Sequence, residues 1–166
     1  MNTIATDKRA LRNAYGQFAT GICIVTTLDP LGQPTGLTVN SFNSVSLEPA
    51  LVLWSLRKES WSTPAFQAAD RFAINVLSHG QREVSDRFAK PLPDKFHNVG
   101  YALGKHDMPL IHGAIAQFEC FKYRQLDGGD HWIFLGEVLD FNHAQGEPLI
   151  FHGGCYATTQ PAVAPA

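Results

Sequence analysis

Apolar and β-branched residues form short runs along the 166-residue chain, and most of these runs predict β-strands. The runs cover residues 22–27, 35–46, 51–56, 72–77, 114–124 and 131–141. Turn-forming residues separate two pairs of runs, at positions 29–32 (Asp-Pro-Leu-Gly) and 127–130 (Asp-Gly-Gly-Asp), which indicates hairpins. The sequence therefore predicts six or more short antiparallel strands.

Three segments have the spacing or the composition of helices, namely residues 7–20, 63–70 and 81–89. In the first, Thr6 or Asp7 is a candidate N-cap and Gly21 a candidate C-terminal stop. The second is predicted to start with Thr63 as its cap and Pro64 at the first helical position, where proline is favoured.

These elements predict a mostly β protein, an antiparallel β-barrel with two or three inserted helices. Residues 131–141 are apolar on both faces, as expected of a barrel wall covered by a helix or another subunit. Residues 91–109 show no clear period, so we expect an irregular segment there. No repeat or linker divides the chain, which predicts a single domain over residues 1–157 and a disordered tail over residues 158–166. No strand–GxGxxG–helix unit is present, which argues against a Rossmann cofactor domain.

The strand over residues 36–46 is unusually rich in hydroxyl and amide side chains. Thr38 and Asn40 fall on one face of this strand, and Ser41 and Asn43 on the other. Burying such groups is unfavourable unless a partner hydrogen-bonds them. Two interpretations remain open: a polar, planar ligand supplies the partner, or this is a polar surface strand.

Composition and charge exclude several function classes. A net charge of −2 gives no reason to expect nucleic acid or an anionic membrane as a partner. The three cysteines, Cys23, Cys120 and Cys155, and the seven histidines have no metal-site spacing, so we expect no metal. Unpaired thiols, the absence of a transmembrane-length apolar stretch and an N-terminus unlike a signal peptide predict a cytoplasmic protein.

An ordered set of short motifs runs through the chain from about Leu11 to Tyr156. The set comprises Phe18-Ala19-Thr20-Gly21, Val25-Thr26-Thr27, the polar strand with Ser44-Val45-Ser46, Ser60 before Pro64-Ala65-Phe66, Phe72-Ala73-Ile74-Asn75-Val76-Leu77-Ser78 with Gln81, Arg87-Phe88-Ala89, Phe118-Glu119-Cys120, Gly129-Asp130-His131, Gly136-Glu137-Val138 and Pro148-Leu149-Ile150-Phe151. With these motifs the chain resembles the short-chain flavin reductases, the reductase partners of two-component flavin monooxygenases.

The resemblance implies an FMN-binding split β-barrel with Greek-key connections, working as a homodimer with flavin near the subunit interface. It implies hydride transfer from NADH or NADPH to FMN or FAD, with reduced flavin passed to a separate oxygenase. In such a reaction the two cofactors carry the chemistry, so no side-chain nucleophile is required. The choices between FMN and FAD and between NADH and NADPH stay open.

Under this resemblance the polar strand is the flavin-binding strand. Backbone amides near Val39 are candidates to contact the N5 and O4 atoms of the flavin. Thr38 and Asn40 are candidates for the polar edge of the ring, and Ser41 for the ribityl chain or the phosphate. These four residues form the first part of the predicted cofactor site.

The loop after the strand over residues 51–56 is the candidate phosphate site, because a phosphate requires hydrogen-bond donors and positive charge. Lys58 and Ser60 are the candidates, with Arg57 as the alternative to Lys58 and a solvated loop as the alternative for both cations. Trp61 is not typical of the family, and we expect it to pack on the surface.

His131 is the candidate catalytic residue, because the resemblance places a histidine here beside the nicotinamide. It would orient the pyridine nucleotide and stabilise charge on reduced flavin. Phe88, Phe96 and Tyr156 are candidates for stacking on the rings, with a core position as the alternative for each.

Two other functions fit a similar barrel. A pyridoxamine-phosphate-oxidase-like enzyme would require an Arg-rich phosphate site, whereas the arginines of this chain are scattered. A non-catalytic flavin-binding module would hold flavin tightly without oxidising NADH.

Overall fold

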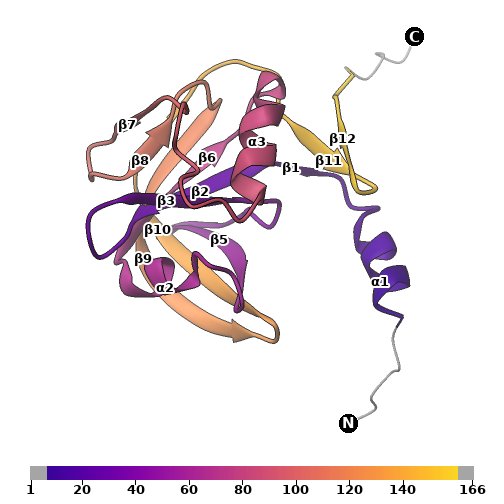
Figure 1. Ribbon diagram of the computed structural model, residues 1–166, viewed down its shortest axis with the longest axis horizontal. Coiled ribbons are helices and arrows are strands. Elements are labelled where there is room, and N and C mark those ends of the chain that lie inside the picture. The colour runs from indigo at the N-terminus through magenta and orange to yellow at the C-terminus, as the bar shows by residue number, and fades with distance from the viewer. Residues whose placement is uncertain (1–6, 161–166) are drawn as a thin grey trace.

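The computed structural model describes residues 7–160, and its centre is one antiparallel sheet of seven strands (Figure 1). In sheet order the strands are β3 (Pro34–Val39), β2 (Cys23–Leu28), β6 (Arg71–Val76), β9 (Ala116–Gly128), β10 (His131–His143), β5 (Ala50–Arg57) and β4 (Asn43–Leu47). Every neighbouring pair is antiparallel. The mostly β, antiparallel class predicted from the sequence is therefore confirmed.

The two edges of this sheet are brought together by the chain itself. β3 and β4 lie at opposite edges, and six strand spacings would separate them by about 29 Å in a flat sheet. Only residues 40–42 connect them, and such a link spans at most about 14 Å. The sheet must therefore curl. Ser41 joins the two sides, because its Oγ accepts from the Ser55 N–H at 2.9 Å and donates to the Ser55 carbonyl at 3.3 Å. The strand ladder itself does not close into a ring.

The interior of the curled sheet is filled mainly by aromatic side chains. Trp54 is fully buried; it stacks on Phe134 at a centroid distance of 4.8 Å and meets Phe66 of α2 (Thr63–Ala68) at 5.0 Å. Gly136 makes room for this packing, because a Cβ there would come within 2.5 Å of the Phe72 ring.

A second buried cluster lies on the outer side of β2, beneath α3 (Arg82–Ala89). Alternate residues of β2 face the two clusters: Cys23 and Val25 point to the interior, whereas Ile24 packs with Phe88 of α3. This two-sided burial explains why every residue of β2 is apolar or β-branched; the hydroxyls of its two buried threonines, Thr26 and Thr27, donate to the carbonyls of Pro109 and Arg71. Also outside the main sheet are the 3₁₀ helix η1 (His79–Gln81) and the two-stranded sheet of β7 (Tyr101–Leu103) and β8 (Pro109–Ile111).

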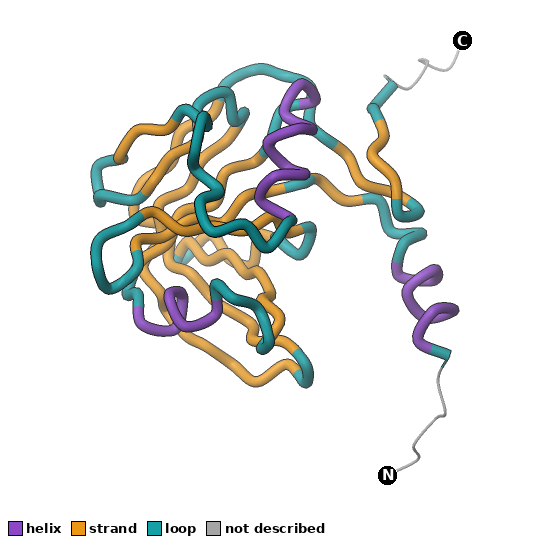
Figure 2. Tube along the Cα trace, viewed as in Figure 1, coloured by secondary structure: helices purple, strands orange, loops and turns teal. Residues whose placement is uncertain are grey.

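The N-terminal helix and a small sheet extend away from the main body (Figures 1 and 2). The helix is α1 (Lys8–Tyr15), and the sheet contains β1 (Thr20–Gly21), β11 (Ile150–His152) and β12 (Cys155–Ala157). None of the residues of α1 is buried.

The first helix is shorter than the sequence predicts. It ends at Gly16, and Thr20 and Gly21 belong to β1 because they pair with β11. Asp7 is the N-cap, and its carboxylate accepts two backbone N–H groups of the first turn. Thr6, the other candidate cap, lies outside the described residues.

Three further expectations need correction. The predicted strand over residues 35–46 is interrupted at residues 40–42, where the chain passes from one sheet edge to the other. Thr63 is not the cap of α2 but its first residue, and its hydroxyl donates to the Arg57 carbonyl at 2.8 Å. The segment over residues 91–109 is not wholly irregular, since it contains β7.

At the C-terminal end, residues 158–160 have no regular structure, and the rest of the predicted tail lies outside the described residues. Within residues 7–160, no helix is long and apolar enough to cross a membrane.

Candidate functional site

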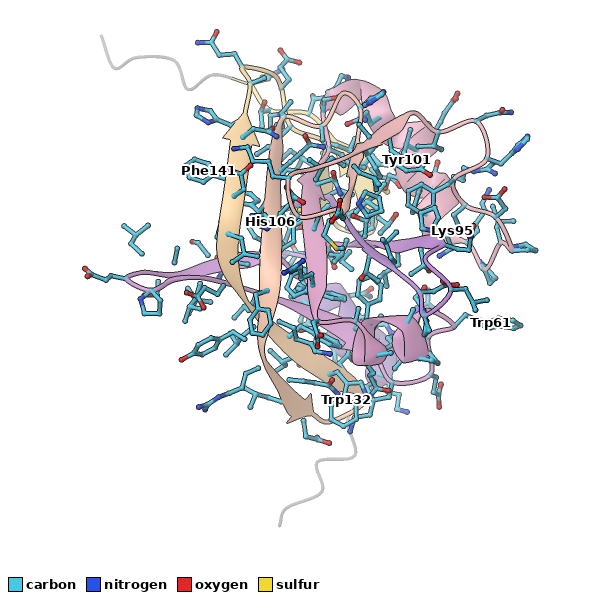
Figure 3. The ribbon with its side chains drawn as sticks, turned by 90° about the vertical axis from the view of Figure 1, so that its left-hand side faces the viewer. Trp61, Lys95, Tyr101, His106, Trp132 and Phe141 are labelled. Carbon is cyan, nitrogen blue, oxygen red and sulfur yellow. The ribbon has the colours of Figure 1, made fainter. Side chains whose placement is uncertain are left out.

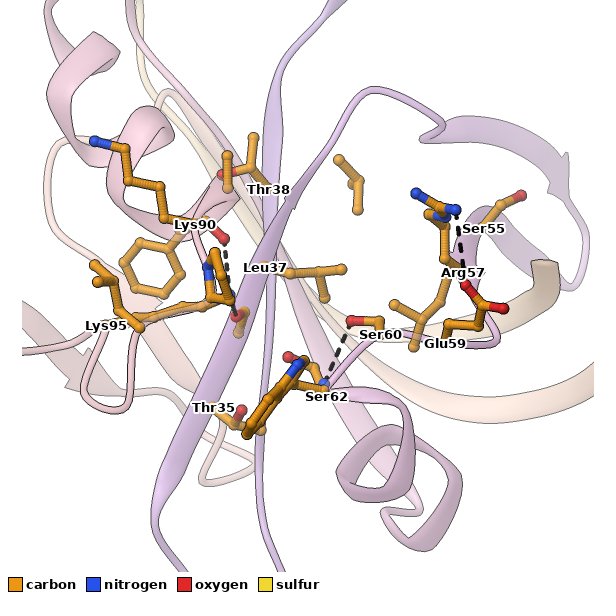
Figure 4. Close-up of a pocket in the computed structure, with 18 of the residues that line it drawn as sticks. Thr35, Leu37, Thr38, Ser55, Arg57, Glu59, Ser60, Ser62, Lys90 and Lys95 are labelled. Atoms are coloured by element: carbon orange, nitrogen blue, oxygen red, sulfur yellow. Dashed lines mark hydrogen bonds and ion pairs between the residues drawn. The ribbon is translucent and has the colours of Figure 1, made fainter. Parts of the chain in front are cut away.

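A pocket of about 840 Å³ opens beside β3 (Figure 4). Its walls are residues 34–41, the turn after β5, and the end of α3 with the segment that follows it; His131 completes the lining. Lys90 and Lys95 lie on one side of β3, and Arg57 and Ser60 on the other. The pocket thus combines an extended backbone with polar groups from two loops.

The pocket runs along the edge of β3 and not over one of its faces. Eight consecutive residues, 34–41, line it, whereas a strand face would contribute only every second residue. β3 pairs only with β2, so its other edge has backbone N–H and C=O groups without strand partners. A planar ligand with donors and acceptors along its rim can pair with such an edge.

Two hydroxyls of the polar strand already have protein partners. Thr38 donates its hydroxyl proton to the Ser85 carbonyl at 2.7 Å, which fixes α3 beside β3. Ser41 exchanges its two hydrogen bonds with Ser55. The inference that these hydroxyls require a ligand is therefore not supported. Both residues, with Val39 and Asn40, nevertheless line the pocket, as the sequence predicts.

The turn after β5 is held by a compact set of hydrogen bonds. The Ser60 N–H donates to the Arg57 carbonyl at 3.0 Å, and the Ser60 Oγ accepts from the Ser62 N–H at 3.3 Å. The guanidinium of Arg57 lies 4.0 Å from the Glu59 carboxylate, with both side chains largely exposed. Arg57 and Ser60 therefore present a cation and a hydroxyl at this end of the pocket.

Lys58, the preferred phosphate ligand predicted from the sequence, is not among the residues that line the pocket. Its ammonium lies 2.6 Å from the Asp127 carboxylate and 4.6 Å from the ring centroid of Trp132. The hydrogen bond from Lys58 lowers the pKa of Asp127 below its ordinary value. The alternative cation, Arg57, is the one that lines the pocket, so the geometry favours Arg57 over Lys58 as the candidate.

His131 lies at the start of β10, directly after a turn in which Gly129 has a φ of +80°. Its Nδ1 is 2.7 Å from the Asp130 carboxylate, and this hydrogen bond lowers the pKa of Asp130. His131 pairs with Arg57 of β5, so the two side chains stand on the same face of the sheet. The structure therefore brings these two residues together at the pocket.

The three candidate stacking residues have different surroundings. Phe88 is fully buried and Phe96 nearly so, with their rings edge to face at 4.9 Å; both contribute to the pocket wall from within the second core cluster. Tyr156 is not a lining residue. Its hydroxyl donates to Asp86 at 2.7 Å and lies 2.9 Å from Ser85, and burial raises its pKa. This geometry favours core positions for Phe88 and Phe96.

Sequence reasoning missed the lysine at the other end of the pocket. Lys95 donates to the carbonyls of Gly36 and Phe88 at 3.2 and 2.9 Å. Burial lowers its pKa below the ordinary lysine value. Lys95 lies in the segment over residues 91–109, which has no hydrophobic periodicity. Only its contacts in the folded chain, with Gly36 and Phe88, distinguish it from the other lysines.

Comparison with known proteins identifies the family of the chain. The family model described as "Flavin reductase like domain" matches residues 15–160. The chain belongs to this family.

Among curated relatives, the FMN reductase (NADH) SmoA of Agrobacterium fabrum is 46% identical over 150 residues, covering 90% of this chain and 85% of SmoA. The reductase component of the flavin-dependent trigonelline monooxygenase of Acinetobacter baylyi is 44% identical, covering 90% of this chain and 48% of that protein. The chain spans about half the length of some of these relatives.

Solved structures share the whole fold. The NADH:FAD oxidoreductase SgcE6 of Streptomyces globisporus, solved in complex with NAD and FAD fragments, has a TM-score of 0.90 and 39% identity, covering 95% of this chain and 96% of SgcE6. The flavin reductase PheA2 has a TM-score of 0.87 and 36% identity, covering 94% of this chain and all of PheA2.

Proposed function

We propose that this chain is a NAD(P)H:flavin oxidoreductase, which takes hydride from NADH or NADPH and reduces FMN or FAD. The observation that carries the proposal is the pocket along the unpaired edge of β3, with Arg57 at one end and Lys95 at the other, in a chain of the flavin reductase family. The names of relatives at 44–46% identity support the same activity.

The residues of the pocket fit a flavin. The edge of β3 offers unpaired backbone groups to the polar rim of the ring system. Within residues 7–160, the half-buried ammonium of Lys95 forms no ion pair with a carboxylate, so a ligand with negative charge would compensate it. Arg57 and the hydroxyl of Ser60 suit a phosphate.

The bound nucleotides supply the hydride chemistry, and the protein positions them. Asp130 holds Nδ1 of His131, which leaves Nε2 as the ring nitrogen available to a ligand. His131 would then orient the pyridine nucleotide beside the ring site, as the family resemblance implies. The turn at residues 57–60 is fixed by its own hydrogen bonds, so little ordering is required when a phosphate binds.

We also propose that the chain passes reduced flavin to a separate oxygenase and acts as a homodimer. Relatives named as reductase components of monooxygenases support the first part. The second is supported by the exposed apolar side chains on and after α1, among them Tyr15 at 69% and Phe18 at 78% exposure, which a second copy would cover. Sedimentation velocity of the purified chain tests the dimer, and a monomer at micromolar concentration would contradict it.

A cytoplasmic location is part of the same proposal. All three cysteines are unpaired, which suits a reducing compartment.

The deciding experiment is oxidation of NADH and NADPH by the purified protein, with and without added FMN or FAD. Turnover that saturates with free flavin supports the reductase. Flavin bound tightly without NAD(P)H oxidation would overturn it, and would favour an oxidase or a binding module.

A further inference from the structure

Trp61 lines the pocket, yet 91% of its surface is exposed. Figure 3 shows its side chain projecting outward at the edge of the molecule, on the same side as Lys95. The other two tryptophans have protein partners: Trp54 is fully buried, and Trp132 lies beside the ammonium of Lys58. Trp61 therefore differs from them in offering its ring to the mouth of the pocket.

The backbone that carries Trp61 is fixed on both sides. The Ser62 N–H donates to the Ser60 Oγ, and the Thr63 N–H donates to the Ser60 carbonyl at 3.0 Å. The Thr63 hydroxyl then ties the turn to the carbonyl of Arg57. The indole thus projects from an ordered turn, so a ring that stacks on it requires ordering of the Trp61 side chain but not of the backbone that carries it.

The position of Trp61 relative to the candidate phosphate site indicates which ligand it serves. FMN ends at its phosphate, whereas FAD continues from that phosphate through a second phosphate and a ribose to adenine. Trp61 follows Ser60 directly and lies at the solvent side of the pocket, where such an extension would emerge. Bases stack well on an aromatic ring, whatever their hydrogen-bonding pattern.

We propose that Trp61 is the stacking platform for the adenine of FAD and that it makes this chain prefer FAD to FMN. The inference rests on the proposed flavin reductase function. Family membership does not decide the question, because one relative is named an FMN reductase and another an NADH:FAD oxidoreductase.

The test compares the dissociation constants of FAD and FMN for the full-length wild type and the variants Trp61→Ala and Trp61→Phe, measured by equilibrium dialysis. Trp61→Ala should weaken FAD binding by about fivefold or more, and FMN binding by less than about twofold. Trp61→Phe should retain most of the FAD affinity, because it keeps an aromatic face. Leu31→Ala is the matched control: Leu31 is 83% exposed but lies outside the pocket, so neither constant should change.

A fluorescence readout tests the contact without flavin. In a Trp132→Phe background, Trp61 is the only exposed tryptophan of the chain. Adding ADP should change its emission and should compete with FAD, whereas ribose 5-phosphate should not change the emission.

Equal weakening of FAD and FMN, or no change in either, would overturn the role of Trp61, and so would an emission that does not respond to ADP. Failure of the proposed function would look different, because the wild type would then reduce neither flavin with NADH or NADPH, whatever Trp61 binds.

Discussion

The two neighbouring cations at the end of β5, Arg57 and Lys58, allow a sharp test of where the flavin phosphate binds. Arg57→Gln removes a positive charge from the pocket but keeps a polar side chain there. A hydrogen bond to a charged group contributes about 1.5–3 kcal/mol. The Arg57 side chain is 61% exposed and already faces Glu59 at 4.0 Å, so we expect a smaller loss of about 1–1.5 kcal/mol. This corresponds to a rise of about five- to twelvefold in the dissociation constant of the flavin.

Lys58→Gln is the matched control, since it removes the same charge one residue away. Lys58 is engaged by Asp127 and Trp132 outside the pocket, so flavin affinity should change by less than about twofold. Quenching of flavin fluorescence on titration with protein gives the flavin dissociation constant of each variant.

Salt provides a second check on the same pair. The Debye length falls from about 10 Å at 0.1 M to about 3 Å at 1 M salt, so the difference between wild type and Arg57→Gln should shrink at high salt. If Lys58→Gln weakened flavin binding as much as Arg57→Gln, the phosphate site inferred from the pocket would be wrong.

Three other predictions concern catalysis, packing and thiol chemistry. His131→Ala should raise the KM for NADH while leaving flavin affinity within about twofold, as steady-state kinetics and flavin titration would show; an unchanged KM and kcat would refute its role. Gly136→Ala should destabilise the fold by about 1–3 kcal/mol, visible as a lower Tm, because the new Cβ would meet the Phe72 ring; an unchanged Tm would show that the interior can relax. Burial raises the pKa of the Cys23 and Cys120 thiols to about 12, whereas Cys155 is exposed, so only Cys155 should react with a thiol reagent at mildly alkaline pH. A second fast-reacting thiol in the native protein would contradict this.

The strands of the main sheet could be predicted from sequence because each has a local signature. β2 is an unbroken apolar and β-branched run, since each of its faces packs against a separate core cluster. β1 and β11 could not be predicted in this way. They are two and three residues long, and their pairing joins segments about 130 positions apart in the chain, so no periodicity marks them.

The choice between Arg57 and Lys58 as the candidate phosphate ligand could not be made from sequence for a different reason. Both follow the apolar run over residues 51–56, and a shift of one residue at the end of this run reverses which side chain faces the pocket. The pairing of Arg57 with His131 across β5 and β10 decides it, and that register depends on the whole hairpin of β9 and β10. Lys95 was missed for a related reason, because its importance comes from the carbonyl of Gly36 on a distant strand.

The residues of the polar strand line the pocket as predicted, although the reason for expecting a ligand there was incomplete. Its hydroxyls were expected to require a ligand, but Thr38 bonds to Ser85 and Ser41 to Ser55. These bonds hold α3 and β5 in place on either side of the edge of β3. The side chains of the strand therefore build the walls, and its backbone is what remains for a ligand along residues 34–41. Under the proposed function, the backbone edge would recognise the rim that all flavins share, so discrimination between FMN and FAD would have to come from the end of the pocket where Arg57, Ser60 and Trp61 lie.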